Sequence, residues 1–137
     1  MHNFNYSRPT SVVDAVKALG TADARPLAGG QTLLPTLRAR LAEPSALIDL
    51  GAIAELKGIK AEAGGITIGA TTTHAEVAAS AEVKKTIPAL AALANGIGDR
   101  QVRNRGTIGG SLANNDPAAD YPAAALGLGA TIRTNKR

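Results

Sequence analysis

The chain has 137 residues, of which 45% are apolar and 19% charged, and its formal net charge is +4. That size allows one domain with a core of its own, or two small lobes. Because there is no cysteine, disulfides, cysteine-held iron–sulfur clusters and a cysteine nucleophile are excluded, and two histidines far apart in sequence predict no metal site. The first ten residues lack the apolar core of a signal peptide, and no apolar run is long enough to cross a bilayer, so we expect a cytoplasmic protein.

The fifteen basic residues are spread along the whole chain. Their densest cluster, Arg100, Arg103 and Arg105, could attract a phosphate group. A mildly basic solvated surface is the simpler interpretation. Because no aromatic residues are interleaved with the cluster, single-stranded nucleic acid would have nothing to stack on, and we expect no nucleic-acid partner.

The first fifty residues predict a small lobe with parallel strands. Ser11 caps a short amphipathic helix, and Asp14 completes a capping-box pattern. A brief strand over 25–30 runs into a second helix over 33–41, and residues 45–50 form a buried strand. Helices that alternate with strands in this way are typical of a parallel sheet.

Glycine signals mark a change of character after residue 51. A strand is predicted over 65–70, and Thr73 and Glu76 then make a second capping box at the start of a helix. His74 follows the capping threonine directly, so we expect it to be an exposed first-turn histidine; a catalytic base is the lesser alternative.

The last part of the chain predicts one more helix and two strands. Apolar residues at helical spacing place the helix over 87–97. The strand candidates are "GTIGGSL" at 106–112 and "LGATIRT" at 128–134.

The stretch "AGGQT", residues 28–32, is the first candidate ligand site. A strand that ends in two glycines and leads into a helix presents backbone N–H groups and the positive end of the helix dipole to one spot, which suits a phosphate. Thr32 could cap the helix or donate its hydroxyl to the same anion. The spacing matches neither a Rossmann fingerprint nor a P-loop, and by itself the stretch is better interpreted as a tight turn.

A second glycine pair in "TIGGS", residues 107–111, is also followed by a hydroxyl residue. Two such loops could line opposite sides of one elongated ligand that carries a diphosphate. Two unrelated turns or β-bulges explain the residues equally well.

The downstream stretch "NNDPAAD" adds two carboxylates. Asp116 precedes a proline and is best explained as a turn or helix N-cap. Asp120 has no such explanation and is the better candidate for a contact to a sugar hydroxyl; an acid–base pair is the alternative. No nucleophile or paired-carboxylate arrangement emerges, so a cofactor would carry any reaction.

Three stretches together resemble a known family: "LAGGQTLLPTLRARLAEPSALIDL", "ITIGATTTHAEVA" and "IGDRQVRNRGTIGGSLANNDPAADYPA". They are similar to the FAD-binding subunit or domain of molybdenum hydroxylases, which includes carbon monoxide dehydrogenase medium subunits and the FAD domain of xanthine dehydrogenase. The resemblance implies an α+β fold with two lobes, the FAD-binding fold of the vanillyl-alcohol-oxidase-like (PCMH) type. It places the first lobe at 1–57 and an incomplete second lobe at 58–137, with the family's C-terminal domain absent.

The resemblance also implies where FAD is held. The loop from residue 27 to 34 would contact the pyrophosphate, residues 107–111 would form the second cradle, Ile97 would lie near the cofactor and Asp120 would contact its sugar or ribityl part. Gln31 and Thr32 stand where many relatives have His and Ser. No catalytic or metal-ligating residue is implied. The complete cofactor-binding set is Leu27, Ala28, Gly29, Gly30, Gln31, Thr32, Leu33, Leu34, Ile97, Thr107, Ile108, Gly109, Gly110, Ser111, Asn115 and Asp120.

The function implied by the resemblance is electron transfer within an oxidoreductase complex. A large partner subunit would carry the molybdenum–pterin centre and a small partner subunit two [2Fe–2S] clusters, and FAD on this chain would pass electrons to an acceptor. A non-catalytic assembly or interaction module derived from such a subunit is the alternative.

Overall fold

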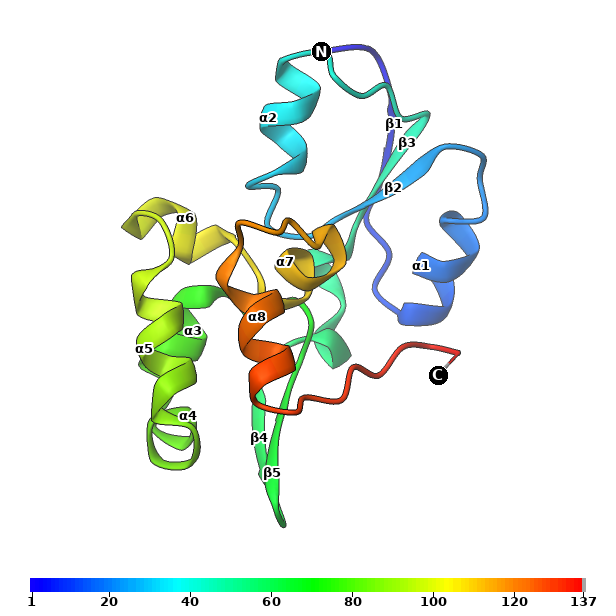
Figure 1. Ribbon diagram of the computed structural model, residues 1–137. Helices are drawn as coiled ribbons and strands as arrows, with labels where there is room; N and C mark the ends of the chain where they lie inside the picture. The colour runs from blue at the N-terminus through cyan, green and yellow to red at the C-terminus, as the bar shows by residue number, and fades with distance from the viewer. Residues whose placement is uncertain (137) are drawn as a thin grey trace.

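The computed structural model describes residues 1–136 and has two lobes (Figure 1). The first lobe is built on a three-stranded sheet of order β1-β3-β2 in which both strand pairs are parallel. Its elements are β1 (Asn5–Ser7), α1 (Val12–Ala18), β2 (Ala24–Leu27), α2 (Leu33–Arg38) and β3 (Ala46–Asp49). Two 3₁₀ turns, η1 (Leu50–Ala52) and η2 (Ala54–Leu56), follow the sheet.

The core of the first lobe forms between α1 and the central strand. β3 has strands on both sides and buries its first three residues, which explains why it is a continuous apolar run. Ser11 caps α1 by accepting a hydrogen bond from the Asp14 amide. Ala15 of α1 packs with Ala46, Ile48 and Ile53 in one apolar cluster.

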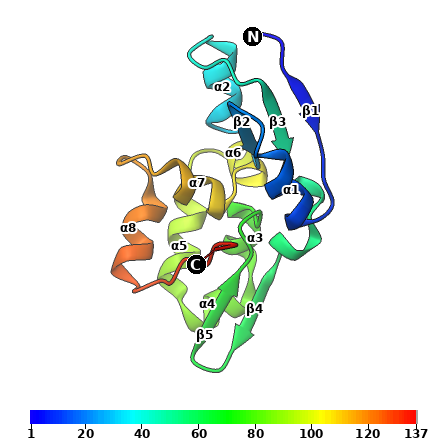
Figure 2. The same ribbon diagram turned by 90° about the vertical axis from the view of Figure 1, so that its right-hand side faces the viewer.

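The second lobe is a β-hairpin covered by helices (Figure 2). The hairpin pairs β4 (Ile59–Glu62) with β5 (Gly65–Ile68), and its core cluster includes Val77, Leu90 and Tyr121. The helices are α3 (His74–Ala79), α4 (Ala81–Thr86), α5 (Pro88–Gly96), α6 (Arg100–Arg105), α7 (Ile108–Asn114) and α8 (Asp120–Gly127). The boundary after residue 57 stays a prediction.

Most of the predicted elements are confirmed, including the parallel sheet, but two strand predictions are wrong. Residues 106–112 enter helix α7, because the Thr107 hydroxyl accepts the Gly110 amide and caps a helix instead of continuing a strand. Residues 128–134 pair with no other strand among the described residues. Strands β1 and β4 and helices α4, α6 and α8 were not predicted. In the part of the chain that the structure describes, no helix is both long and apolar enough to span a bilayer.

Candidate functional site

The two glycine motifs lie against each other in the structure. A Cβ atom added to Gly29 would lie 2.0 Å from the carbonyl oxygen of Arg105, and one added to Gly110 would lie 3.9 Å from Cβ of Ala28. The loop after β2 therefore packs on the backbone that leads into α7. Only glycine permits the approach at position 29, since the atoms it meets belong to the main chain.

The first motif forms an open cradle at the carboxyl end of β2. The backbone amides of residues 29–33 have no hydrogen-bond acceptor in the part of the chain that the structure describes. Gly30 has a φ of +73°, a left-handed conformation that favours glycine. The Gln31 side-chain amide donates to the Gly29 carbonyl oxygen at 3.1 Å, which closes the turn. Five consecutive amides at the start of α2 are thus available to an anion.

The hydroxyl of Thr32 is also free for a ligand. Thr32 is the N-cap residue of α2, but its side chain makes no capping hydrogen bond, and the residue is exposed. Pro35 lies in the first turn of α2, where its missing N–H leaves no hydrogen bond unmade. The Thr32 hydroxyl does not cap the helix, so it is available to donate a hydrogen bond to a ligand.

The second motif is organised differently, because its amides are already used. The Ile108 amide donates to the Thr72 carbonyl oxygen at 3.1 Å and the Gly109 amide to the Ala70 carbonyl oxygen at 2.9 Å. Thr107 accepts the next two amides, from Gly110 on Oγ1 and from Ser111 on its carbonyl oxygen. What this motif offers a ligand is the half-buried Ser111 hydroxyl, which has no partner among the described residues.

His74 is not the exposed first-turn histidine that the sequence predicts. It is 5% exposed, because residues 106–108 pair with residues 72–74 and cover it. Its ring faces that of Tyr121, with centroids 5.2 Å apart, and neither His74 Nδ1 nor the Tyr121 hydroxyl has a hydrogen-bond partner in the described structure. Burial lowers the pKa of His74 and raises the pKa of Tyr121. The capping box that precedes His74 is present as predicted.

The remaining predicted cofactor residues lie at the ends of helices of the second lobe. Ile97 is the C-cap of α5 and packs, like Ile108, on the apolar cluster of the second lobe. Asn115 ends α7 in a left-handed conformation, with φ of +48°. Asp120 begins α8, is exposed, and has no hydrogen-bond or ion-pair partner in the described part of the chain. No hydrogen bond of the described residues joins Ile97 or Asp120 to either glycine motif.

Asp116 forms the predicted turn: its carboxylate accepts the Ala118 amide at 2.9 Å. Two other features were missed by the sequence analysis. The carbonyl oxygens of Ala70 and Thr72 hold the second motif, and no sequence pattern marks a backbone acceptor. Arg103 donates from Nη1 to the carbonyl oxygens of Ile97 and Gly98; it stood out only as a member of the basic cluster.

Comparisons with known proteins identify the chain as a flavin-binding domain. The family model described as "FAD binding domain in molybdopterin dehydrogenase" matches residues 2–137, so the chain belongs to this family and its cofactor is FAD. The chain is 42% identical to the glyceraldehyde dehydrogenase medium chain of Sulfolobus acidocaldarius over 130 residues, which cover 94% of this chain and 46% of that protein. It is 45% identical over 127 residues to the carbon monoxide dehydrogenase medium chain of Hydrogenophaga pseudoflava, covering 91% of this chain and 44% of that one.

Solved structures confirm the fold that the resemblance implied. A structure of carbon monoxide dehydrogenase from Hydrogenophaga pseudoflava that lacks the Mo-pyranopterin moiety superposes with a TM-score of 0.89 at 46% sequence identity, over 91% of this chain and 44% of that chain. The chain therefore has the two-lobed α+β fold of these FAD subunits and spans less than half the length of the relatives it matches.

Proposed function

We propose that this chain holds the diphosphate of FAD between its two glycine motifs. The observation that carries the proposal is the row of unpartnered amides from residue 29 to residue 33, beside two hydroxyls that also lack partners, on Thr32 and Ser111. A diphosphate offers acceptor oxygens and negative charge, which is what donors at the start of a helix bind. The residues present therefore fit the cofactor.

Each motif has its own task in this arrangement. The amides of the first loop donate to the phosphate oxygens, while Thr32 and Ser111 donate their hydroxyls. Glycine at position 110 keeps a side chain out of the contact between the two motifs, since an added Cβ would lie 2.8 Å from Thr107 Oγ1 and 3.9 Å from Cβ of Ala28. The free carboxylate of Asp120 accepts from a sugar or ribityl hydroxyl, and Ile97 supplies an apolar contact.

The wider function we propose is electron transfer in a molybdopterin-dependent oxidoreductase. When bound, FAD would supply the redox chemistry between iron–sulfur clusters of a small partner subunit and an electron acceptor, and a large partner subunit would hold the molybdenum centre. The names of the relatives, which are medium chains of dehydrogenases, support this role. The side chains of this chain bind and orient the cofactor and take no catalytic part.

The test is a flavin titration of the purified chain. FAD binding should quench flavin fluorescence, and riboflavin, which lacks the diphosphate, should bind much more weakly. Thr32→Val and Ser111→Ala should each weaken FAD binding about 10- to 100-fold, the value of one hydrogen bond to a charged group, without changing the melting temperature. Thr67→Val is the matched control, because Thr67 is exposed on β5 and also has no partner in the described structure.

Two results would contradict the proposal. Equal affinity for FAD and riboflavin would show that the diphosphate is not held, and unchanged FAD affinity in Ser111→Ala would remove the second motif from the site. A chain that binds no FAD at all would favour the assembly module over the electron-transfer subunit.

A further inference from the structure

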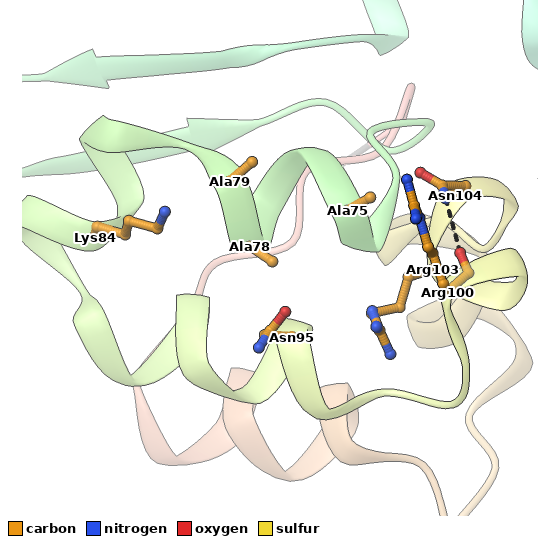
Figure 3. A pocket seen from close by; sticks show the side chains of 8 residues that line it. All are labelled: Ala75, Ala78, Ala79, Lys84, Asn95, Arg100, Arg103 and Asn104. Atoms are coloured by element: carbon orange, nitrogen blue, oxygen red, sulfur yellow. Dashed lines mark hydrogen bonds between the residues drawn. The ribbon is translucent and has the colours of Figure 1, made fainter.

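A groove on the second lobe is formed by residues that are not assigned to the cofactor. It lies between α3, α5 and α6 and has a volume of about 330 Å³ (Figure 3). Ala75, Ala78 and Ala79 of α3 line one wall. Because these side chains are short, another chain can approach the helix closely.

The groove is positively charged at both ends. Lys84 of α4 lies at one end, and Arg100 and Arg103 of α6 lie at the other (Figure 3). None of the lining residues is acidic, and neither Lys84 nor Arg100 forms an ion pair with any carboxylate in the described part of the chain. The hydrogen bonds from Arg103 to the Ile97 and Gly98 carbonyl oxygens, at 3.2 and 2.8 Å, fix its guanidinium group.

None of the acidic residues on the same elements forms an ion pair with these cations in the described structure. Glu76 is engaged in the capping box of α3, and Asp99 accepts an amide in the first turn of α6. Glu82 precedes Lys84 by two residues on α4, and residues at that spacing do not face each other on a helix. The charge of the groove is therefore available to a partner.

A polar side chain also points into the groove from α5. Asn95 projects between the cationic ends (Figure 3), and its amide has no hydrogen-bond partner in the described structure. A side-chain amide carries both donors and an acceptor, which suits a peptide backbone. Asn104, by contrast, already donates to the Arg100 carbonyl oxygen at 2.8 Å.

We propose that this groove, with Lys84 at one end and Arg100 at the other, docks an acidic segment of a partner protein. We call it the basic groove. On an extended segment, carboxylates at alternate positions lie on one side and recur about every 6.6 Å. A segment of this kind therefore presents a row of negative charges to the cations at the two ends of the groove, with Asn95 bonding to its backbone.

The experiment measures fluorescence anisotropy of a labelled Gly-Glu-Gly-Glu-Gly-Glu peptide with the purified chain at low salt. We expect binding of this peptide and none of the glutamine equivalent. The double variant Lys84→Glu/Arg100→Glu should weaken binding at least about tenfold. The matched control is Lys17→Glu/Arg25→Glu, which makes the same change in net charge at exposed positions of α1 and β2 and should change binding less than about twofold.

Four results would overturn the proposal. The first two are that the acidic peptide does not bind, and that both double variants weaken its binding equally. The third is that an equal concentration of inorganic phosphate displaces the peptide. The fourth is that a single-stranded oligonucleotide binds more tightly than the peptide and loses its binding in Lys84→Glu/Arg100→Glu. FAD titration of the groove variant separates the two proposals. Its FAD affinity should be unchanged, and a failure of the chain to bind FAD would leave the peptide result standing.

Discussion

Gly29→Ala tests whether the contact between the two motifs fixes the site. The added Cβ would lie 2.0 Å from the Arg105 carbonyl oxygen and 2.8 Å from Cα of Gly106, whereas real Cβ contacts stay above 3.0 Å. The two backbones must therefore separate. Overpacking of this kind destabilises by about 1–3 kcal/mol.

The separation also endangers two hydrogen bonds. Gly106 donates to the Val102 carbonyl oxygen at 2.7 Å and accepts from the His74 amide at 3.0 Å. With about 1 kcal/mol for each weakened bond, the total loss is about 3–5 kcal/mol. For a chain of this length that is a fall in melting temperature of about 10–15 °C.

The assay is thermal denaturation followed by circular dichroism, with a flavin titration below the transition. Gly96→Ala is the control, since its Cβ meets nothing within 4 Å and alanine favours the helix; it should melt at or slightly above the wild-type temperature. We expect Gly29→Ala to lose FAD affinity as well, because the loop amides move with the backbone. Stability within about 0.5 kcal/mol of wild type would refute the close contact.

Three further predictions concern the second lobe. Gly110→Val should lower FAD affinity and the free energy of unfolding, the latter by about 1 kcal/mol, because its Cβ would meet Thr107 Oγ1 at 2.8 Å and disturb the cap of α7. Gly127→Val is the control, since Gly127 has open space around it, and it should not change FAD affinity. Equal effects of the two variants would contradict the prediction. Burial lowers the pKa of His74, so the unfolded chain binds the proton first as pH falls below about 6.5, and the free energy of unfolding should fall there. In His74→Phe this fall should be less steep. Identical pH profiles of the two proteins in denaturant titrations would show that His74 is not responsible. Tyr121→Phe removes an unpartnered buried hydroxyl and should leave stability equal or about 1 kcal/mol higher, whereas a loss of that size would reveal a partner for the hydroxyl.

Local signals were sufficient where an element carries its own cap. Ser11 and Thr73 accept the amides that their spacing predicts, and the helices begin there. The parallel sheet was also predictable, because helices and strands alternate along the first fifty residues.

The errors came from contacts between distant segments. Thr107 forms a single bridge to Thr73 and then caps a helix, so only the start of the predicted strand is extended. The β-branched Thr131 and Ile132 favour a strand, but a strand needs a partner, and the described chain offers them none. The burial of His74 depends on the same bridge and carries no sequence pattern of its own.

Part of the candidate site was within reach of the sequence. Two glycine pairs, each followed by a hydroxyl, left open whether two loops serve one ligand or are unrelated turns, and the structure brings these loops together. The division of labour between them was not predictable, because it depends on which carbonyl oxygens lie opposite the amides. Ala70 and Thr72 satisfy the second loop, while the first loop has no such neighbours among the described residues.

That asymmetry has a consequence for the entropy of cofactor binding. The amides of residues 108–111 are held before any ligand arrives, so this half of the site is preorganised. The amides of residues 29–33 lack such bonds, so the phosphates would be their first acceptors. Hydrogen exchange should therefore be slow at 108–111 with or without flavin, and FAD should bring new protection mainly to the loop after β2.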